Sequence, residues 1–184
     1  TLLHNETFEF ENIRQYIKNL LSKNISIIPN SSKTKTEILN FCQELEEELP
    51  FIVENGAAIY KMNLVNSDFP EKIILSRDKE EILNVFYKKI PKEFISKCKF
   101  VFKLKKDEQL KIFGLSEKQL SYASDREFSV PIIFKGNKAE KNNLFKLACS
   151  MGLTMQEGGR VINLSDKVSK SFAMKKVSRI FEKT

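Results

Sequence analysis

Two polar segments, each following an apolar run, carry groups that could bind an anion. The run Ile25–Ile28 leads into Ser31-Ser32-Lys33-Thr34, and the run Phe51–Val53 leads into Glu54-Asn55-Gly56-Ala57. Open α/β sheets bring ligand groups together at the carboxyl ends of their strands. The Ser31 and Ser32 hydroxyls, the Lys33 ammonium group and a turn at two such strand ends therefore predict one anion site. Phosphate esters are the ligands usually held at such an edge.

Two arginines further along the chain are candidates for binding the same kind of anion. Guanidinium groups match carboxylates and phosphates through two parallel hydrogen bonds, and Arg126 and Arg160 could each supply one. For Arg126, a surface ion pair with Asp125 or Glu127 is an equally open interpretation. Ser31 also has a second interpretation, because a serine before a helix commonly caps the free N–H groups of its first turn.

The first 90 residues alternate helices and strands. Apolar residues at helical spacing predict amphipathic helices, and short apolar runs predict strands. The pair Asn55-Gly56 predicts a tight reversal, since both residues tolerate positive φ. The predicted helices are 10–24, 34–49 (closed by Pro50) and 78–90, and the predicted strands are 25–28, 51–53, 57–60 and 72–75.

The chain then changes character and resembles a small α+β module. Lys99–Leu104 alternates polar and apolar residues, which predicts a half-exposed strand. Ser116 and Gln119 have the spacing of a capping box at a helix start. The remaining predicted elements are a strand at 130–134, a helix around 144–151, a hairpin of 153–157 and 160–164 around Gly158-Gly159, and a last helix from about residue 170.

The net charge of +7 could indicate a polyanionic partner, but the lysines are scattered. The densest run, Lys97–Lys106, mostly alternates with apolar residues and predicts the solvent face of a strand, with Phe100, Phe102 and Leu104 on the dry face. A solvated face is favoured over a stripe that binds nucleic acid. We therefore expect no nucleic-acid partner.

Cysteine usage and hydropathy indicate a cytoplasmic protein without a membrane partner. Cys42, Cys98 and Cys149 are odd in number, widely separated and set in apolar stretches, which predicts reduced core residues. No apolar run approaches the roughly 18 residues that a membrane helix needs, and the first residues show no basic-then-apolar signal pattern. The sequence does not indicate an oligomeric state.

Six short motifs occur along the chain in a fixed order: Thr1-Leu2-Leu3, Ser31-Ser32-Lys33-Thr34, Glu54-Asn55-Gly56-Ala57, Arg126-Glu127-Phe128-Ser129-x-Pro131, Gly158-Gly159-Arg160 and Lys170-x-x-Ala173. Together they resemble the mannosyl-3-phosphoglycerate phosphatase family, a Cof-type branch of the haloacid dehalogenase-like phosphatases. The resemblance implies an α/β fold with a doubly wound, Rossmann-like core at 1–77 and 166–184, incomplete in this chain, and an inserted α+β cap at 78–165.

In that family, catalysis begins with an aspartate in the motif Asp-x-Asp-Gly-Thr-Leu-Leu, helped by a second aspartate and Mg²⁺. This chain begins at the threonine of that motif and ends before the family's acidic metal-binding loop. The resemblance therefore implies that the chain as given is inactive, and that its parent is a Mg²⁺-dependent phosphatase. We also expect the incomplete core to fold less stably than the cap.

The resemblance also assigns roles to individual residues. It implies that Ser31 and Lys170 are catalytic, with Ser31 holding a phosphoryl oxygen and Lys170 neutralising charge on the nucleophile and the phosphoryl group. The alternative for Lys170 is an ordinary surface lysine, and His4 is expected in an exposed loop. The substrate-binding residues are expected to be Ser32, Lys33, Glu54, Asn55, Gly56, Arg126, Ser129, Gly159 and Arg160, and no metal ligand is assigned.

The function implied by the resemblance is hydrolysis of mannosyl-3-phosphoglycerate, or another glycosyl-3-phosphoglycerate, to the glycosylglycerate compatible solute. A small sugar phosphate is thus the expected partner and Mg²⁺ the expected cofactor. Two alternatives remain open at this point. One is a related phosphatase for glucosyl-3-phosphoglycerate, sucrose phosphate or another sugar phosphate, and the other is a non-catalytic module that binds phosphate groups or polyanions.

Overall fold

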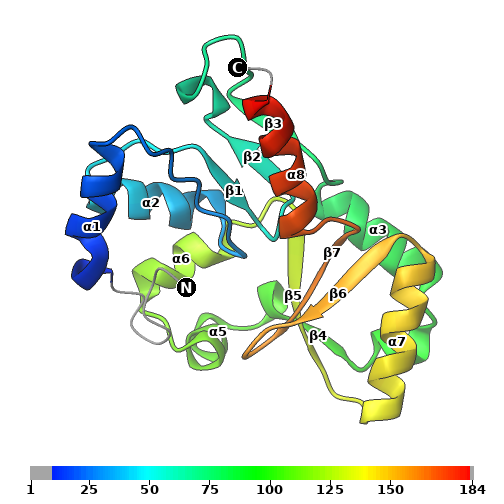
Figure 1. Ribbon diagram of the computed structural model, residues 1–184. Coiled ribbons are helices and arrows are strands. Elements are labelled where there is room, and N and C mark those ends of the chain that lie inside the picture. The colour runs from blue at the N-terminus through cyan, green and yellow to red at the C-terminus, as the bar shows by residue number, and fades with distance from the viewer. Residues whose placement is uncertain (1–9, 183–184) are drawn as a thin grey trace.

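The computed structural model describes residues 10–182, so the expectations for Thr1-Leu2-Leu3 and His4 lie outside the described residues. The described chain has the mixed α/β fold that the sequence predicts, built on two antiparallel sheets (Figure 1). The first sheet has the order β1-β2-β3, with strands Phe51–Val53, Ala58–Tyr60 and Lys72–Ile74. The second has the order β4-β5-β7-β6, with strands Cys98–Phe100, Ser129–Phe134, Ile162–Asp166 and Leu153–Glu157.

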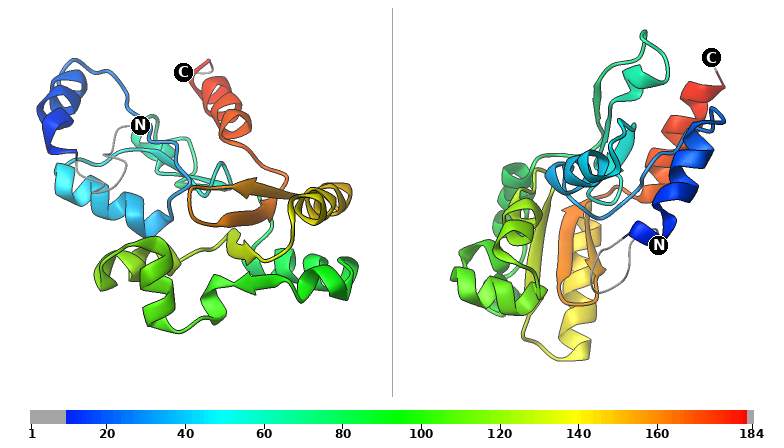
Figure 2. Two further views of the ribbon diagram at one scale, coloured as in Figure 1. Left: turned by 90° about the horizontal axis from the view of Figure 1, so that it is seen from below. Right: turned by 90° about the vertical axis from the view of Figure 1, so that its left-hand side faces the viewer.

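Helices cover both faces of the first sheet. Side chains alternate across a strand, so Phe51 and Val53 point to one face of β1 and Ile52 to the other. Phe51 and Val53 pack with residues of α1 (Glu11–Leu21) and α2 (Lys35–Leu45). Ile52 packs with Ala173 and Val177 of α8 (Lys170–Phe181), and Figure 2 shows α8 on the side away from α2. Because both faces are covered, all three residues of β1 are buried.

The second sheet has its own hydrophobic core. Apolar residues of α3 (Lys79–Lys89) and α7 (Lys138–Ser150) pack against β5, β6 and β7, with Phe86 and Leu144 fully buried. The remaining elements are short: η1 (Met62–Leu64), α4 (Lys92–Ile95), η2 (Val101–Lys103), α5 (Lys106–Phe113) and α6 (Glu117–Ser124).

Several predicted turns and helix starts are confirmed. Asn55-Gly56 joins β1 to β2 as a reversal, with φ of 62° and 101° at these two residues. Ser116 and Gln119 form the predicted capping box, in which the Ser116 hydroxyl accepts from the Gln119 N–H at 3.3 Å. The last helix begins at Lys170 as expected. The N-cap of α2 is Thr34, so the interpretation of Ser31 as the cap is wrong.

Two strand predictions are wrong in part. Residues 25–28 form no regular strand, and the nearby pairing is a single parallel bridge between Asn30 and Ile52. Two features limit the hydrogen bonds that residues 25–29 can make with a neighbouring strand. The Ile25 N–H donates back to the Leu20 carbonyl at 3.1 Å, and Pro29 has no N–H to donate. The strand expected at 99–104 ends at Phe100, where a 3₁₀ turn breaks the alternation.

Three expectations about single residues also need correction. The 3₁₀ turn after Phe100 buries Val101 and leaves Phe102 47% exposed, although Phe102 was expected on the dry face. Helix α2 ends at Leu45 because Glu46 adopts the left-handed conformation, so Leu49 lies outside it. Cys42 and Cys98 are buried as predicted, but Cys149 is exposed. It follows Ala148 on α7, and consecutive helical residues point about 100° apart.

Arg77 and Asp166 join the two connections that run between the sheets. The backbone N–H and Nε of Arg77 donate to Asp166 Oδ2 at 2.9 and 3.0 Å, and Arg77 Nη2 donates to Oδ1 at 2.8 Å. Nη2 also donates to the Gly152 carbonyl at 3.0 Å. The domain division at 77/78 and 165/166 stays a prediction, and this ion pair lies where the chain would cross it.

The Arg77–Asp166 pair predicts a pH-dependent contribution to stability. Hydrogen bonds from the Arg77 side chain lower the pKa of Asp166 from 3.8 to about 2. A carboxyl group with a lowered pKa stabilises the fold above its ordinary pKa, and this contribution is lost as the pH falls through the folded-state value. Asp166→Asn should lower the free energy of unfolding by about 1 to 2 kcal/mol at pH 7. In urea titrations from pH 7 to pH 2 this deficit should shrink below pH 4.

The matched control is Glu157→Gln, which removes an ion pair with Lys141 whose carboxylate is 54% exposed. Exposed pairs contribute little, so this variant should differ from the parent chain by less than about 0.5 kcal/mol. A deficit for Asp166→Asn that is as large at pH 2.5 as at pH 7 would show that the charge of Asp166 is not what stabilises the connection.

Candidate active site

Three segments that are far apart in the sequence meet beside the first sheet. The Asn55 N–H, in the turn after β1, donates to the Ser31 carbonyl at 2.9 Å. The Asn30 side-chain amide donates to the Lys170 carbonyl in the first turn of α8 at 3.0 Å. The Ser31 N–H in turn donates to the Ile52 carbonyl of β1 at 3.1 Å. The backbones that carry Ser31, Asn55 and Lys170 are thus held in one place.

Gly56 permits the close approach between the turn and α8. Its φ of 101° is one that residues with a side chain rarely adopt. A Cβ atom at this position would lie 2.3 Å from the Ser169 carbonyl oxygen and 3.1 Å from the Lys170 nitrogen. Glycine at position 56 is therefore required both by the turn conformation and by the backbone of α8.

The Ser31–Thr34 segment forms a loop fixed at both ends. The Ser31 hydroxyl oxygen accepts from the Lys33 N–H at 3.2 Å, and the Lys33 carbonyl accepts from the Glu54 N–H at 3.0 Å. The Lys33 ammonium group pairs with Glu37 at 2.7 Å. Thr34 is fully buried, and its hydroxyl donates to the Tyr122 carbonyl at 2.7 Å. These contacts hold the loop in one conformation and leave the Ser32 side chain exposed.

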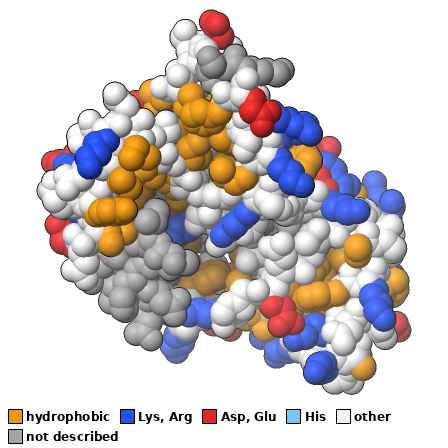
Figure 3. All heavy atoms as spheres, viewed as in Figure 1, with side chains coloured by type: hydrophobic (Ala, Val, Ile, Leu, Met, Phe, Trp, Pro, Cys, Tyr) orange, Lys and Arg blue, Asp and Glu red, His pale blue; other side chains and the backbone are white. Residues whose placement is uncertain are grey.

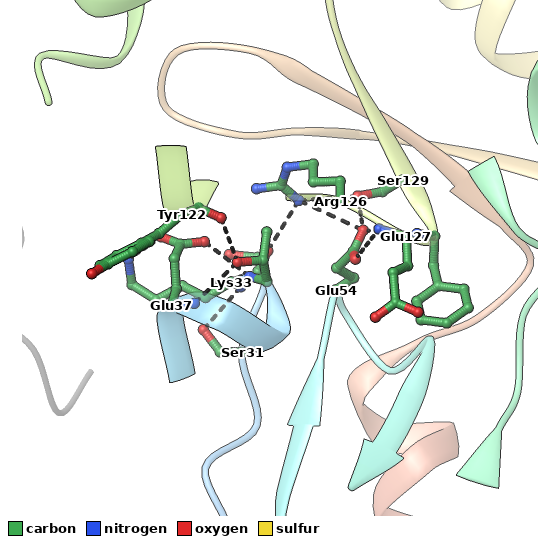
Figure 4. A network of polar contacts seen from close by, with 11 residues as sticks. Ser31, Lys33, Glu37, Glu54, Tyr122, Arg126, Glu127 and Ser129 are labelled. Carbon is green, nitrogen blue, oxygen red and sulfur yellow. Dashed lines mark hydrogen bonds and ion pairs between the residues drawn. The ribbon is translucent and has the colours of Figure 1, made fainter. Parts of the chain in front are cut away.

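A second group of polar side chains links the turn after β1 to the start of β5 (Figure 4). The Glu54 carboxylate, 1% exposed, accepts from the N–H groups of Glu127 and Phe128 at 2.9 and 3.2 Å and from the Ser129 hydroxyl at 2.5 Å. Burial raises the pKa of Glu54, and the Ser129 hydroxyl, the Arg126 charge and the two backbone donors oppose that shift.

Arg126 lies between this group and the Ser31–Thr34 loop. Its Nη1 donates to the Ser129 hydroxyl at 3.0 Å and to the Ser32 carbonyl at 3.3 Å, and it lies 4.0 Å from Glu54 Oε2. The surface ion pair considered for Arg126 with Asp125 or Glu127 is not what the structure shows. Its side chain is 13% exposed, and the charged group that it faces is Glu54.

Lys170 is the first residue of α8 and is exposed, while Ser169 caps the helix by accepting from the Phe172 N–H at 3.1 Å. A cation at a helix N-terminus opposes the helix dipole and is unfavourable for the helix itself. The Lys170 carbonyl is held by Asn30, next to the Ser31–Thr34 loop. Lys170 thus does not stabilise its own helix but lies on the segment beside the loop that the sequence predicts to bind an anion.

Gly159 and Arg160 lie apart from the other predicted residues. They are exposed in the turn between β6 and β7, where a Cβ added to Gly114 would lie 3.3 Å from Arg160 Nη1. Ser129 pairs with Ser165, at the end of β7 that leads to α8, and Arg160 precedes the opposite end of that strand. Five residues of extended chain span about 15 Å, so the structure does not bring these two residues to the loop at Ser31.

The surface between the two sheets is hollowed, and Lys or Arg side chains lie at the rim of the hollow (Figure 3). Within residues 10–182, no group of three or more His, Cys, Asp or Glu side chains is arranged to hold a metal ion. The carboxylates of this part of the chain thus do not form the Mg²⁺ site that the resemblance implies. The same described residues include no helix of the length and apolarity needed to cross a membrane.

Sequence reasoning missed several residues that build this site. Asn30, Thr34, Tyr122 and Glu127 all take part in its hydrogen bonds. The helix start at Thr34 was predicted, and the spacing of Thr34 and Glu37 is that of a capping box. No local signal marks the contact of Thr34 with Tyr122, because 88 residues separate the two.

Comparison with known proteins identifies the family. Residues 1–179 match the model of the haloacid dehalogenase-like hydrolases, and the chain belongs to that family. A glucosyl-3-phosphoglycerate/mannosyl-3-phosphoglycerate phosphatase from Persephonella marina is 31% identical over 99% of this chain and 70% of its own length. A mannosyl-3-phosphoglycerate phosphatase from Pyrococcus horikoshii is 29% identical over 68% of this chain, and the match spans about half (54%) of that relative.

Solved structures agree on the fold. The sugar phosphatase BT4131, described as subclass IIB of the superfamily, superposes with a TM-score of 0.64 at 15% identity, over 99% of this chain and 73% of its own. A haloacid dehalogenase-like hydrolase from Bacteroides thetaiotaomicron gives 0.64 at 12% identity, over 98% and 73%. These structures confirm the predicted fold class, and the match to the family model confirms the predicted family. By class, the chain is a phosphoric monoester hydrolase.

The contact at Gly56 predicts that Gly56→Ala will be strongly destabilising. The methyl group would collide with the Ser169 carbonyl, and the turn would be strained at positive φ. We expect a loss of about 2 to 4 kcal/mol in the free energy of unfolding, measured by urea titration. Gly159→Ala is the matched control, because a Cβ at Gly159 meets nothing within 4 Å. Equal stability of the two variants would contradict the close approach.

Proposed function

We propose that the protein is a phosphatase acting on glucosyl- or mannosyl-3-phosphoglycerate, with the glycosylglycerate and inorganic phosphate as products. The observation that carries the proposal is the meeting of the Ser31–Thr34 loop, the Glu54–Ala57 turn and the start of α8. The names of two relatives supply the substrate class. Cytoplasmic location and Mg²⁺ as cofactor belong to the same proposal and rest on the resemblance to this family.

Several of the predicted residues have a role that their position supports. The Ser31 hydroxyl holds a phosphoryl oxygen, since a donor placed at developing charge stabilises it. The Lys170 ammonium group neutralises the phosphoryl group from the start of α8. Ser32, Lys33, Asn55 and Gly56 shape the loop and the turn around the phosphate.

Arg126 is placed to bind the glycerate carboxylate. Its guanidinium group extends from the segment before β5 to the Ser32 carbonyl, so a phosphate held at Ser31 would lie near it. A planar guanidinium group binds a carboxylate more specifically than an ammonium group does. The carboxylate would then distinguish a glycosyl-3-phosphoglycerate from sucrose phosphate and from simple sugar phosphates. Gly159 and Arg160 remain proposed substrate contacts only for the distal, sugar end of the ligand.

The proposal is tested by a substrate panel on the whole protein with Mg²⁺ present. We expect kcat/KM for mannosyl- and glucosyl-3-phosphoglycerate to exceed that for sucrose 6-phosphate and glucose 6-phosphate at least about tenfold. Ser31→Ala and Lys170→Met should each lower kcat/KM by about 10² to 10³. Phosphate release is the measurement.

The chain offers a matched control for each variant. Ser22→Ala changes an exposed hydroxyl nine residues before Ser31, and Lys167→Met changes an exposed lysine three residues before Lys170. Both controls should stay within about threefold of the parent protein. Losses as large as those of Ser31→Ala and Lys170→Met would refute the assigned roles, and equal rates on all sugar phosphates would refute the substrate class.

A further inference from the structure

Glu54 was expected to contact the substrate, but its carboxylate is buried and already fully engaged. It is 1% exposed and receives three hydrogen bonds from residues 73 to 75 positions further along the chain. A ligand bound in the hollow cannot reach a side chain buried in this way. The carboxylate instead joins the turn that carries Asn55 and Gly56 to the first residues of β5.

The Ser129 hydroxyl connects Glu54 to Arg126. It donates to Glu54 Oε2 at 2.5 Å and accepts from Arg126 Nη1 at 3.0 Å, so one hydroxyl serves both charged groups. Ser129 itself is 1% exposed, which keeps water from replacing either contact. The three side chains form a relay in which the position of the carboxylate fixes the position of the guanidinium group.

The charge of Arg126 needs this carboxylate. A buried guanidinium group without a counter-charge is strongly unfavourable, and Glu54 lies 4.0 Å away. The Nε atom of Arg126 is buried and has no hydrogen-bond partner in the structure. A ligand can reach the part of the Arg126 side chain that is exposed, 13% of it.

We propose that Glu54 is a positioning residue, which through Ser129 holds Arg126 beside the Ser31–Thr34 loop so that the guanidinium group can bind the carboxylate of a phosphorylated hydroxy acid. The proposal rests on the proposed function and deepens it. It replaces the expected direct contact of Glu54 with substrate by an indirect role. Phosphate binding itself depends on the loop and α8, and so is independent of Glu54.

The test compares two probes by isothermal titration calorimetry. 3-Phosphoglycerate carries a phosphate and a carboxylate, whereas inorganic phosphate carries the phosphate alone. Glu54→Gln should weaken binding of 3-phosphoglycerate by about tenfold or more and change the affinity for inorganic phosphate by less than about twofold. Arg126→Gln should give the same pattern. In the double variant the two losses should not add, because Glu54 acts through Arg126.

Glu127→Gln is the matched control. The Glu127 carboxylate also joins the two parts of the fold, accepting from the Tyr60 hydroxyl at 3.1 Å and the Lys72 ammonium group at 3.0 Å, but it does not take part in the relay. It should therefore retain the preference for 3-phosphoglycerate. If Glu54→Gln fails to fold, Ser129→Ala removes only the bridging hydroxyl and should still weaken 3-phosphoglycerate binding about threefold or more.

A spectroscopic signature separates positioning from a general loss of structure. The Nε–H signal of Arg126 should exchange slowly with water in the parent protein and shift on adding 3-phosphoglycerate but not inorganic phosphate. In Glu54→Gln it should exchange fast. Equal losses for both probes, an equal loss in Glu127→Gln, or additive losses in the double variant would overturn the proposal. A protein without activity on glycosyl-3-phosphoglycerates would refute the proposed function, while the two-probe comparison would still decide the role of Glu54.

Discussion

The candidate site depends on one close backbone contact, between Gly56 in the turn after β1 and the Ser169–Lys170 peptide at the start of α8. The turn also binds the Ser31 carbonyl through the Asn55 N–H. A single residue without a side chain therefore allows three segments of the chain to share one edge of the first sheet. Any residue with a Cβ atom would push α8 away, and Lys170 would move with it.

The buried carboxylate of Glu54 has a different part in the same arrangement. The backbone contact at Gly56 brings together groups for a phosphate, whereas Glu54 brings in a group from the start of β5. In the proposed function, the phosphate and the carboxylate of the substrate would therefore bind to elements of different sheets. The turn that begins at Glu54 contacts both the Ser31–Thr34 loop and the start of β5. A change in this turn would therefore alter the spacing between that loop and Arg126.

Local patterns predicted much of this fold, but they did not predict the long-range contacts of the site. Asn55-Gly56 and the capping box at Ser116 were readable because a turn or a helix start is set by a few neighbouring residues. The prediction of a strand at 99–104 was wrong because polar and apolar residues keep alternating in the sequence beyond Phe100, whereas the backbone turns into a 3₁₀ helix at Val101. For the site, the sequence indicated Ser31 and Lys170 as partners, but the burial of Glu54 depends on donors more than 70 residues away. No local pattern distinguishes such a glutamate from a solvated one.

The ion pair of Arg77 and Asp166 has a mechanical consequence. One connection leads from β3 to α3 and the other from β7 to α8. Arg77 and Asp166 lie on these two connections, and the two-point contact between guanidinium and carboxylate holds the connections at a fixed separation. Because Glu54 and the Glu127 carboxylate also join the first sheet to the start of β5, rotation as well as sliding of one sheet relative to the other would have to break buried or charged contacts.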